Sequence, residues 1–209
     1  MRVQGSALAF LRFLPTPKPK PKMSQDSVVR VAVVVTFLRM ERAPVSVGPV
    51  LPDGCDVRVI SGCSVEMYRF LYDTVGADYV WWLRRTMSDV QLAGLLRDPR
   101  VSIHVLYRDG VVAGFYELDR STRPVTNLNY FGLMPDAVGA NLGQAFLRHA
   151  VETAWREGPR ALTVNTCTAD HRRAMPNYLR AGFRVVRHAH EEWQVPRRLG
   201  LVIPERLQR

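Results

Sequence analysis

Two apolar runs near the start of the chain predict β-strands. Residues 28–40, VVRVAVVVTFLRM, are rich in β-branched side chains, a composition typical of a partly or wholly buried strand. Residues 56–60 alternate apolar and polar positions and predict a second strand. Between these two runs, residues 43–54 hold three prolines and two glycines, which is typical of a linker or an edge loop.

The pattern then changes to the spacing of helices. In residues 64–76 the apolar positions recur at intervals of three and four, and Ser64 stands where a helix N-cap is expected. Residues 87–99 predict a second helix, with Ser88 as its cap and Pro99 beyond its end. Two helices are therefore expected before the next strand.

The second half of the chain alternates between strand and helix patterns. Residues 101–120 predict a hairpin around Asp109-Gly110, a dipeptide that favours a two-residue turn. The elements that follow are a strand (126–135), an amphipathic helix (141–159), a strand (161–168), a short helix (170–183) and a last strand (184–195). The strand–helix–strand step from 126 to 168 implies a parallel crossover within an otherwise antiparallel sheet. The predicted fold class is α/β (α+β), with a mixed, mostly antiparallel sheet.

Charge separates the first 22 residues from the rest of the chain. The net charge is +10, and residues 1–22 carry five basic residues and no acidic one. The only lysines of the chain are Lys18, Lys20 and Lys22. We therefore expect residues 1–22 to be a disordered basic extension, with a transit peptide as the rival interpretation. The remaining charge rests on arginines scattered along the sequence, so it does not favour a nucleic-acid partner.

The cysteine and histidine content favours a protein without a structural metal. Cys55, Cys63 and Cys167 are odd in number and form no CxxC pair, which argues against a disulfide framework or a zinc site and for a reducing compartment. His188 and His190 share one strand face but have no evident third ligand. No apolar run approaches the ~20 residues that a membrane span needs. We expect a soluble, cytoplasmic protein.

The segment PDAVGANLGQAF, residues 135–146, predicts a loop that leads into a helix. The N-terminus of a helix presents unpaired N–H groups and a partial positive charge, so it can bind phosphate without a lysine. Gly139 and Gly143 would let the backbone approach a ligand closely. The segment lacks the GK[ST] of a Walker loop and does not match GxGxxG. Taken alone, it fits a structural turn as well as a phosphate site.

Together with NTCTADHRRAMPNYLRAGF, this loop resembles the GCN5-related N-acetyltransferase family. In that family an R/Q-x-x-G-x-G/A loop holds the pyrophosphate of acetyl-CoA, and an N-x-x-A-x-x-x-Y-x-x-x-G-F block follows it. The loop positions fall on Val138, Asn141 and Gly143. The later block falls on His171, Ala174, Tyr178, Gly182 and Phe183. The resemblance covers about residues 55 to 195, and the order of the predicted elements matches that of the family.

The resemblance implies helices on both faces of the sheet and acetyl-CoA as a co-substrate, with no metal. The cofactor-binding residues that it implies are Leu133, Met134, Val138, Gly139, Ala140, Asn141, Leu142, Gly143 and His171. Three of these depart from the family pattern: Val138 replaces Arg or Gln, Asn141 replaces a glycine, and His171 replaces Asn. These departures predict a reduced affinity for the coenzyme.

The same reasoning divides the chain into four parts. They are the basic extension (1–22), an N-terminal strand with its Pro/Gly linker (23–54), the acetyltransferase domain (55–195) and a C-terminal tail (196–209).

Transfer of an acyl group from a thioester to an amine needs an acid for the leaving sulfur and a route for the proton of the amine. The resemblance implies that Tyr178 is the acid and that backbone N–H groups near Leu133 and Met134 stabilise the oxyanion. Glu117, on the neighbouring strand, is the best available carboxylate for the base. A water chain, or an amine that is already neutral, would dispense with it.

Two stretches keep alternative interpretations. Cys167 could form an acyl-enzyme or simply fill space as a small apolar side chain. Residues 79–85, YVWWLRR, could line the acceptor pocket or form part of the core. Arg84 and Arg85 could contact a phosphate of the coenzyme or an acidic substrate.

Three hypotheses of function follow from these observations. The first is an N-acetyltransferase that moves an acetyl group from acetyl-CoA directly to a primary amine, which would be a small molecule or a peptide amine. The second is a non-catalytic acyl-CoA-binding module with the same fold, suggested by Val138, Asn141 and Asn127. The third, a nucleic-acid-associated protein, rests on charge alone. The sequence leaves a homodimer open.

Overall fold

The computed structural model describes residues 27–45 and 48–209, so the predicted extension at 1–22 lies outside the described residues. The strands are β1 (Val28–Met40), β2 (Cys55–Val59), β3 (Val101–Arg108), β4 (Val111–Asp119), β5 (Val125–Leu133), β6 (Ala161–Cys167) and β7 (Arg184–Pro196). The α-helices of the described ranges are α2 (Val65–Gly76), α3 (Asp89–Leu96), α4 (Leu142–Trp155) and α5 (Ala174–Arg180). The described residues also form five single 3-10 turns: η2 (Ala77–Tyr79), η3 (Arg84–Thr86), η4 (Pro135–Ala137), η5 (Arg197–Leu199) and η6 (Glu205–Leu207).

The local sequence chemistry explains where several of these elements begin. The Ser64 side chain accepts a hydrogen bond from the N–H of Met67 at the start of α2. Ser88 and Gln91 form a reciprocal capping box at the start of α3. Asp109 and Gly110 both have positive φ, as a tight hairpin between β3 and β4 requires. These three predictions are confirmed.

The seven strands form one mixed sheet in the order β2-β3-β4-β5-β6-β1-β7. The pair β5–β6 is parallel and the other pairs are antiparallel, as the α4 crossover requires. This confirms the predicted fold class. β1 lies between β6 and β7, so a strand assigned to the N-terminal flank is an interior strand of the sheet.

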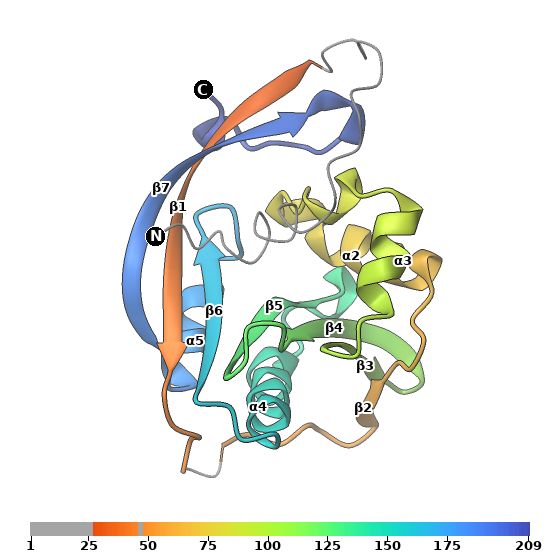
Figure 1. Ribbon diagram of the computed structural model, residues 1–209, viewed down its shortest axis with the longest axis vertical. Helices are drawn as coiled ribbons and strands as arrows, with labels where there is room; N and C mark the ends of the chain where they lie inside the picture. The colour runs from red at the N-terminus through yellow and green to blue at the C-terminus, as the bar shows by residue number, and fades with distance from the viewer. Residues whose placement is uncertain (1–26, 46–47) are drawn as a thin grey trace.

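The β1–β7 pair runs the full length of both strands, whereas β6 pairs only with the second half of β1. As Figure 1 shows, the two strands therefore continue together past the end of β6. A second apolar cluster covers this extension, and it includes Ile203 and Leu207 from beyond β7. The sheet and its apolar clusters thus take in parts of both segments that flank the predicted domain at 55–195.

Helices cover both faces of the sheet. Phe115 and Tyr116 are consecutive residues of β4, so their side chains point to opposite faces. Phe115 packs against Tyr68 of α2, and Tyr116 packs against Phe146 of α4. The helices α2 and α3 contact each other on one face, and α4 and α5 contact each other on the other face (Figure 1). The main core cluster lies on both sides of β3, β4 and β5.

The sheet opens at one place, between β5 and β6. Their parallel pairing ends at Leu128 and Val164. At the same level β5 has a bulge: Glu117 pairs with Tyr130 and Leu118 pairs with Leu128, which leaves Asn129 without a partner. The bulge turns the second half of β5 away from β6, so the backbone on that side of residues 129–133 is not paired with a strand. Among the described residues, no helix has both the length and the apolar content to cross a membrane.

Candidate functional site

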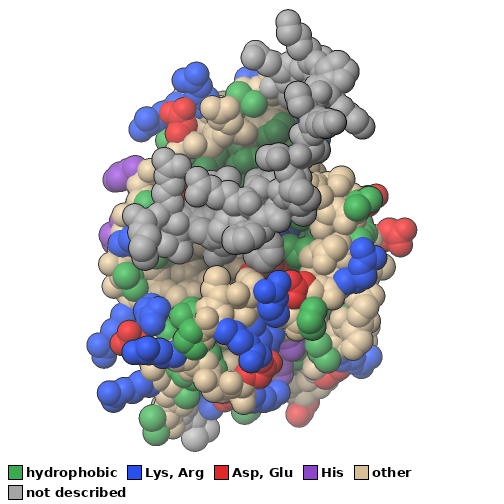
Figure 2. Space-filling model, in the orientation of Figure 1, with side chains coloured by type: hydrophobic (Ala, Val, Ile, Leu, Met, Phe, Trp, Pro, Cys, Tyr) green, Lys and Arg blue, Asp and Glu red, His purple; other side chains and the backbone are tan. Residues whose placement is uncertain are grey.

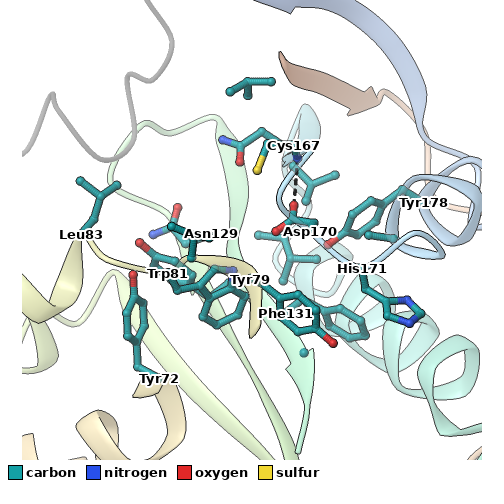
Figure 3. A pocket seen from close by; sticks show the side chains of 18 of the residues that line it. Tyr72, Tyr79, Trp81, Leu83, Asn129, Phe131, Cys167, Asp170, His171 and Tyr178 are labelled. Atoms are coloured by element: carbon teal, nitrogen blue, oxygen red, sulfur yellow. Dashed lines mark hydrogen bonds between the residues drawn. The ribbon is translucent and has the colours of Figure 1, made fainter. Parts of the chain in front are cut away.

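The opening between β5 and β6 is a cavity of about 230 Å³. Its walls are residues 127–133 of β5, the end of β6 with the turn that follows, residues 79–84, and the starts of α4 and α5. Figure 3 shows side chains from these separate segments pointing into it. The cavity is therefore reached from both the α4/α5 face and the α2 face of the sheet.

The loop before α4 presents backbone donors beside this cavity. Gly139 has a φ of +93°, which glycine adopts most easily, and Asn141 has a φ of 60° in the left-handed region. Asn141 makes no side-chain cap. The N–H groups of Gly139, Asn141, Leu142 and Gly143 make no hydrogen bond to another described residue. Gly143 itself lines the cavity, so a close approach to this helix end is open.

Two predicted loop donors are already used inside the loop. The N–H of Val138 bonds to the carbonyl of Pro135, and that of Ala140 bonds to the carbonyl of Ala137. Val138 is 44% exposed. The Leu142 side chain is buried in the core, so only its backbone can face a ligand. The donors for an anion are therefore fewer than the sequence implied.

The oxyanion donors predicted at Leu133 and Met134 are only half available. The Met134 N–H bonds to the carbonyl of Ala113 and is therefore held in the β4–β5 ladder. The oxyanion role expected for Met134 does not agree with this placement. N–H groups alternate in direction along an antiparallel strand. With the register Gly114↔Leu133, the N–H groups of Leu133 and Phe131 therefore point away from β4, toward the opening.

Tyr178 lies on α5 with its ring between Phe131 and Phe183. The residue is only 6% exposed, yet it lines the cavity. Its hydroxyl makes no hydrogen bond to a described residue. Burial, with a smaller contribution from Asp170, raises the pKa of the phenol well above its ordinary value. The hydroxyl is therefore protonated and has its hydrogen-bonding capacity free.

Glu117 does not reach the cavity. It is fully buried on the α2 face, where Arg84 donates to its Oε1 over 2.7 Å and the Tyr68 hydroxyl donates to its Oε2 over 2.5 Å. The Asn129 amide also donates to Oε1 over 2.7 Å. Every oxygen of this carboxylate is thus engaged with a protein donor. The expectation that Glu117 faces the substrate does not agree with this placement, because the β5 bulge puts Asn129 between it and the opening.

A different carboxylate, Asp170, does line the cavity. It lies in the turn after β6, where its Oδ2 accepts hydrogen bonds from Thr166 Oγ1 (2.7 Å) and the Cys167 N–H (2.9 Å). Burial raises the pKa of Asp170, and these hydrogen bonds only partly offset that effect. The sequence pattern did not indicate Asp170 as a site residue, because it predicted one helix over residues 170–183, whereas α5 begins at Ala174.

His171 and Cys167 also line the cavity. His171 Nδ1 accepts the N–H of Arg173 and its ring meets Tyr79 edge to face, so the ring is fixed against the turn. Burial raises the pKa of the Cys167 thiol far above its ordinary value, with Asp170 adding to the effect. A thiol that stays protonated is a poor nucleophile, which argues against an acyl-cysteine.

The segment 79–85 contributes to both the cavity and the core. Trp81 packs against Tyr72, Phe115 and Tyr130 while lining the cavity. The two arginines point elsewhere: Arg84 to Glu117, and Arg85 to Asp73. Neither arginine is therefore free to bind a phosphate or an acidic substrate.

The remaining chemical candidates give no metal site. His188 Nδ1 bonds to the Thr36 hydroxyl over 2.9 Å on the β1–β7 surface. Over residues 27–45 and 48–209, no three side chains of the types His, Cys, Asp and Glu gather as they would around a metal ion. Basic and acidic side chains lie interspersed on the face shown in Figure 2, so no stripe of one charge marks that face.

Comparison with known proteins identifies a family for this chain. The family model described as "Acetyltransferase (GNAT) family" matches residues 68–183, more than half of the chain. No curated protein sequence matches the chain.

Solved structures resemble the fold at low sequence identity. A GCN5-related N-acetyltransferase from Sphaerobacter thermophilus is 16% identical with a TM-score of 0.55, over 83% of this chain and 55% of its own. A GCN5-related N-acetyltransferase from Kribbella flavida is 17% identical with a TM-score of 0.54, over 80% and 60%. A Drosophila protein is 16% identical with a TM-score of 0.59, over 83% and 54%. The chain thus spans little more than half the length of these proteins.

Proposed function

The chain belongs to the acetyltransferase (GNAT) family, and from this premise we propose that it transfers an acetyl group from acetyl-CoA directly to a primary amine. One observation carries the proposal: the cavity between β5 and β6 joins free N–H donors of the α4 loop to the unpartnered hydroxyl of Tyr178. An anion-binding helix end beside an acid is the arrangement that this reaction needs.

The size of the cavity fits the reacting groups. A volume of about 230 Å³ can hold an acetyl thioester and an amine. It is smaller than the ~300–1,000 Å³ of pockets that enclose whole drug-sized ligands. The nucleotide end of coenzyme A would therefore lie outside, with its pyrophosphate against the N–H groups of Gly139, Asn141, Leu142 and Gly143.

The protons released in the reaction determine which acid and base groups the site needs. The reaction forms the C–N bond of an amide and breaks the C–S bond of the thioester. An acceptor that arrives as an ammonium ion gives up two protons: one must leave before attack, and the other ends on the thiol of coenzyme A. In this proposal Tyr178 protonates the leaving sulfur and regains a proton from the acceptor nitrogen. The N–H groups of Leu133 and Phe131 stabilise the oxyanion.

Glu117 takes a structural part in this proposal. It holds Arg84 and Asn129, two residues of the cavity wall, in place, and it does not remove the proton of the amine. The neighbours Asn127 and Asn129 continue the network, since Asn127 donates to Asn129 and accepts from Thr163 Oγ1 over 2.8 Å. The network thus joins β4, β5 and β6 at the point where the sheet opens.

Two measurements with the full chain test the proposal. Calorimetric titration with acetyl-CoA should show micromolar binding, and thiol release should depend on an added primary amine. Absence of binding at millimolar acetyl-CoA contradicts the proposal outright. Binding without thiol release for any amine supports the second candidate, a non-catalytic acyl-CoA-binding module, which the exposed Val138 in place of Arg or Gln favours.

A further inference from the structure

One part of the cavity wall differs from the rest in its chemistry. It consists of three tryptophans and one carboxylate, Trp81, Trp82, Trp193 and Asp170, which we call the tryptophan wall. All three indoles are partly exposed, although each also packs against an apolar cluster: Trp81 against the main core, and Trp82 and Trp193 against the second cluster.

The three tryptophans of this wall lie on the α2 face of the sheet, and Asp170, which accepts a hydrogen bond from Thr166 of the other face, lies where the two faces meet. Val31 pairs with Trp193, and Val35 pairs with Cys167, so these four side chains share one face of β1, β6 and β7. Trp82 and Trp193 pack against the same apolar cluster as those valines. The α4 loop and Tyr178 are on the other face. The cavity therefore has a coenzyme side and, across the sheet, an aromatic side.

Asp170 is a carboxyl group held by hydrogen bonds, from Thr166 Oγ1, the Cys167 N–H and the Trp81 side chain, and not by an ion pair with a described residue. None of the ion pairs of the described residues includes it. Burial, with a smaller contribution from Asp170, raises the pKa of Tyr79, Cys167 and Tyr178, so these three neighbours are neutral at pH 7. The other buried acid near the cavity, Glu117, has Arg84 as its partner.

Aromatic faces and an unpaired carboxylate together suit a cation with an apolar body. The charged residues around this wall also disfavour anionic ligands. Arg84 is the one arginine among the described lining residues, and Glu117 already neutralises it, so this side offers no unpaired arginine to a carboxylate or a phosphate. Trp193 donates its indole N–H to Glu191 over 2.9 Å, which fixes the ring in its orientation.

We propose that the tryptophan wall is the acceptor subsite and that it selects a monocationic primary amine with an aromatic or apolar body. The ammonium group pairs with Asp170, and the body lies among Trp81, Trp82 and Trp193. Asp170 takes the first proton of the ammonium group and releases it to solvent, and the neutral amine then attacks across the opening. This inference rests on the proposed acetyl transfer, because it names the substrate class of that site.

A matched series of amines tests the inference with the full-length protein and acetyl-CoA. The series contains phenethylamine, phenylalanine (the same ring with a carboxylate), ethanolamine (no ring), spermidine (several charges) and a short peptide with a free N-terminus. Burial of the ring gives phenethylamine an expected advantage of about tenfold or more in kcat/KM over ethanolamine. Phenylalanine should be worse than phenethylamine, because its carboxylate faces Asp170. A preference for the peptide or for spermidine overturns the inference and leaves the proposed function standing.

Variants separate the subsite from the reaction. Trp193→Ala should raise the KM for phenethylamine about tenfold and leave that for ethanolamine unchanged. Phe70→Ala is the matched control, since Phe70 is 51% exposed and does not line the cavity. Asp170→Asn should weaken, by about tenfold or more, the binding of every amine that carries a charge. An unchanged KM in Trp193→Ala, with normal folding by circular dichroism, overturns the inference.

A binding readout keeps the inference testable without turnover. Phenethylamine added to the protein with coenzyme A should quench tryptophan fluorescence, and Asp170→Asn should weaken the quenching. If the amine binds in this way but is never acetylated, the proposed function fails and the subsite stands. If phenethylamine gives no quenching in the wild type, the subsite fails.

Discussion

Arg84 and Glu117 form an ion pair of 2.7 Å in which the side chains are 7% and 0% exposed. Two buried charges are tolerated only when each is paired and its remaining hydrogen-bonding capacity is used. Tyr68 and Asn129 supply the other bonds of the carboxylate. This pair therefore fixes η3 against the β5 bulge, and through the bulge it maintains the opening of the sheet.

Glu117→Gln should destabilise the protein by about 3 kcal/mol or more, because it leaves the Arg84 charge buried without a partner. Chemical denaturation measures this change in the free energy of unfolding. Turnover per folded molecule should stay within a few-fold of the wild type. Loss of turnover at unchanged stability would instead identify Glu117 as the base. Glu192→Gln is a suitable control, since Glu192 pairs with Arg30 on the exposed surface and its loss should cost about 1 kcal/mol or less.

Tyr178→Phe should lower kcat about 100-fold, because the leaving thiolate loses its acid. Affinity for acetyl-CoA should be unchanged, since the ring and its packing remain. Tyr107→Phe controls for loss of a phenol elsewhere: Tyr107 lies on β3 beneath Arg58, outside the cavity. Because burial raises the pKa of Tyr178, the wild-type rate should not fall between pH 8 and pH 10 through loss of this proton. Full activity in Tyr178→Phe means that water or another group protonates the sulfur.

The sequence predicted best what depends on neighbouring residues. The Ser64 cap and the Asp109-Gly110 turn each act over a few positions, and both appear where expected. The parallel crossover followed from a strand–helix–strand order, which needs no knowledge of register. These features explain why the fold class could be read from the pattern.

What the sequence could not predict depends on partners far away along the chain. The position of β1 between β6 and β7 is set by pairing across more than a hundred residues. The pattern of residues 101–120 put Glu117 on a strand, but nothing local indicated that Arg84 would neutralise it there. The role of Met134 failed for the same reason, because its N–H is used by Ala113. Asp170 was not identified because the helix was expected to begin at residue 170, four residues before the start of α5.

The ionisation of Asp170 should give both the rate and the stability a characteristic pH dependence. The pKa of this carboxyl is raised by burial, so the fold favours its protonated form. The contribution of this protonated group to the free energy of unfolding is complete below the ordinary Asp pKa of about 3.9. It is lost as the pH rises through the higher pKa that Asp170 has in the folded state. The base must be ionised, so kcat/KM should rise over the same interval.

Asp170→Asn should therefore abolish the acid limb of kcat/KM and raise Tm at pH 8, with no gain at pH 3.5. The amide oxygen can still accept the bonds from Thr166 and the Cys167 N–H, so the turn should be preserved. Differential scanning calorimetry at the two pH values measures the stability. A lower Tm at pH 8 would mean that the carboxylate stabilises the fold and that its charge is not held there for an acceptor.

The departures in the α4 loop allow a gain-of-function test. Val138 is 44% exposed at the position where the family has Arg or Gln, beside N–H groups of the loop that have no protein partner. Val138→Arg should bind coenzyme A at least about tenfold more tightly than the wild type does, because a charge-assisted hydrogen bond to the pyrophosphate is worth about 1.5–3 kcal/mol. Calorimetric titration gives the Kd, and pantetheine, which has no phosphate, should bind the variant and the wild type equally.

Val202→Arg is the control variant for this prediction. It adds the same charge at a position that is 83% exposed and outside the cavity, and it should change neither the affinity for coenzyme A nor that for pantetheine. An equal gain for both Arg variants would show that net charge alone is responsible, and a gain for pantetheine would show that Val138 does not lie near the phosphates.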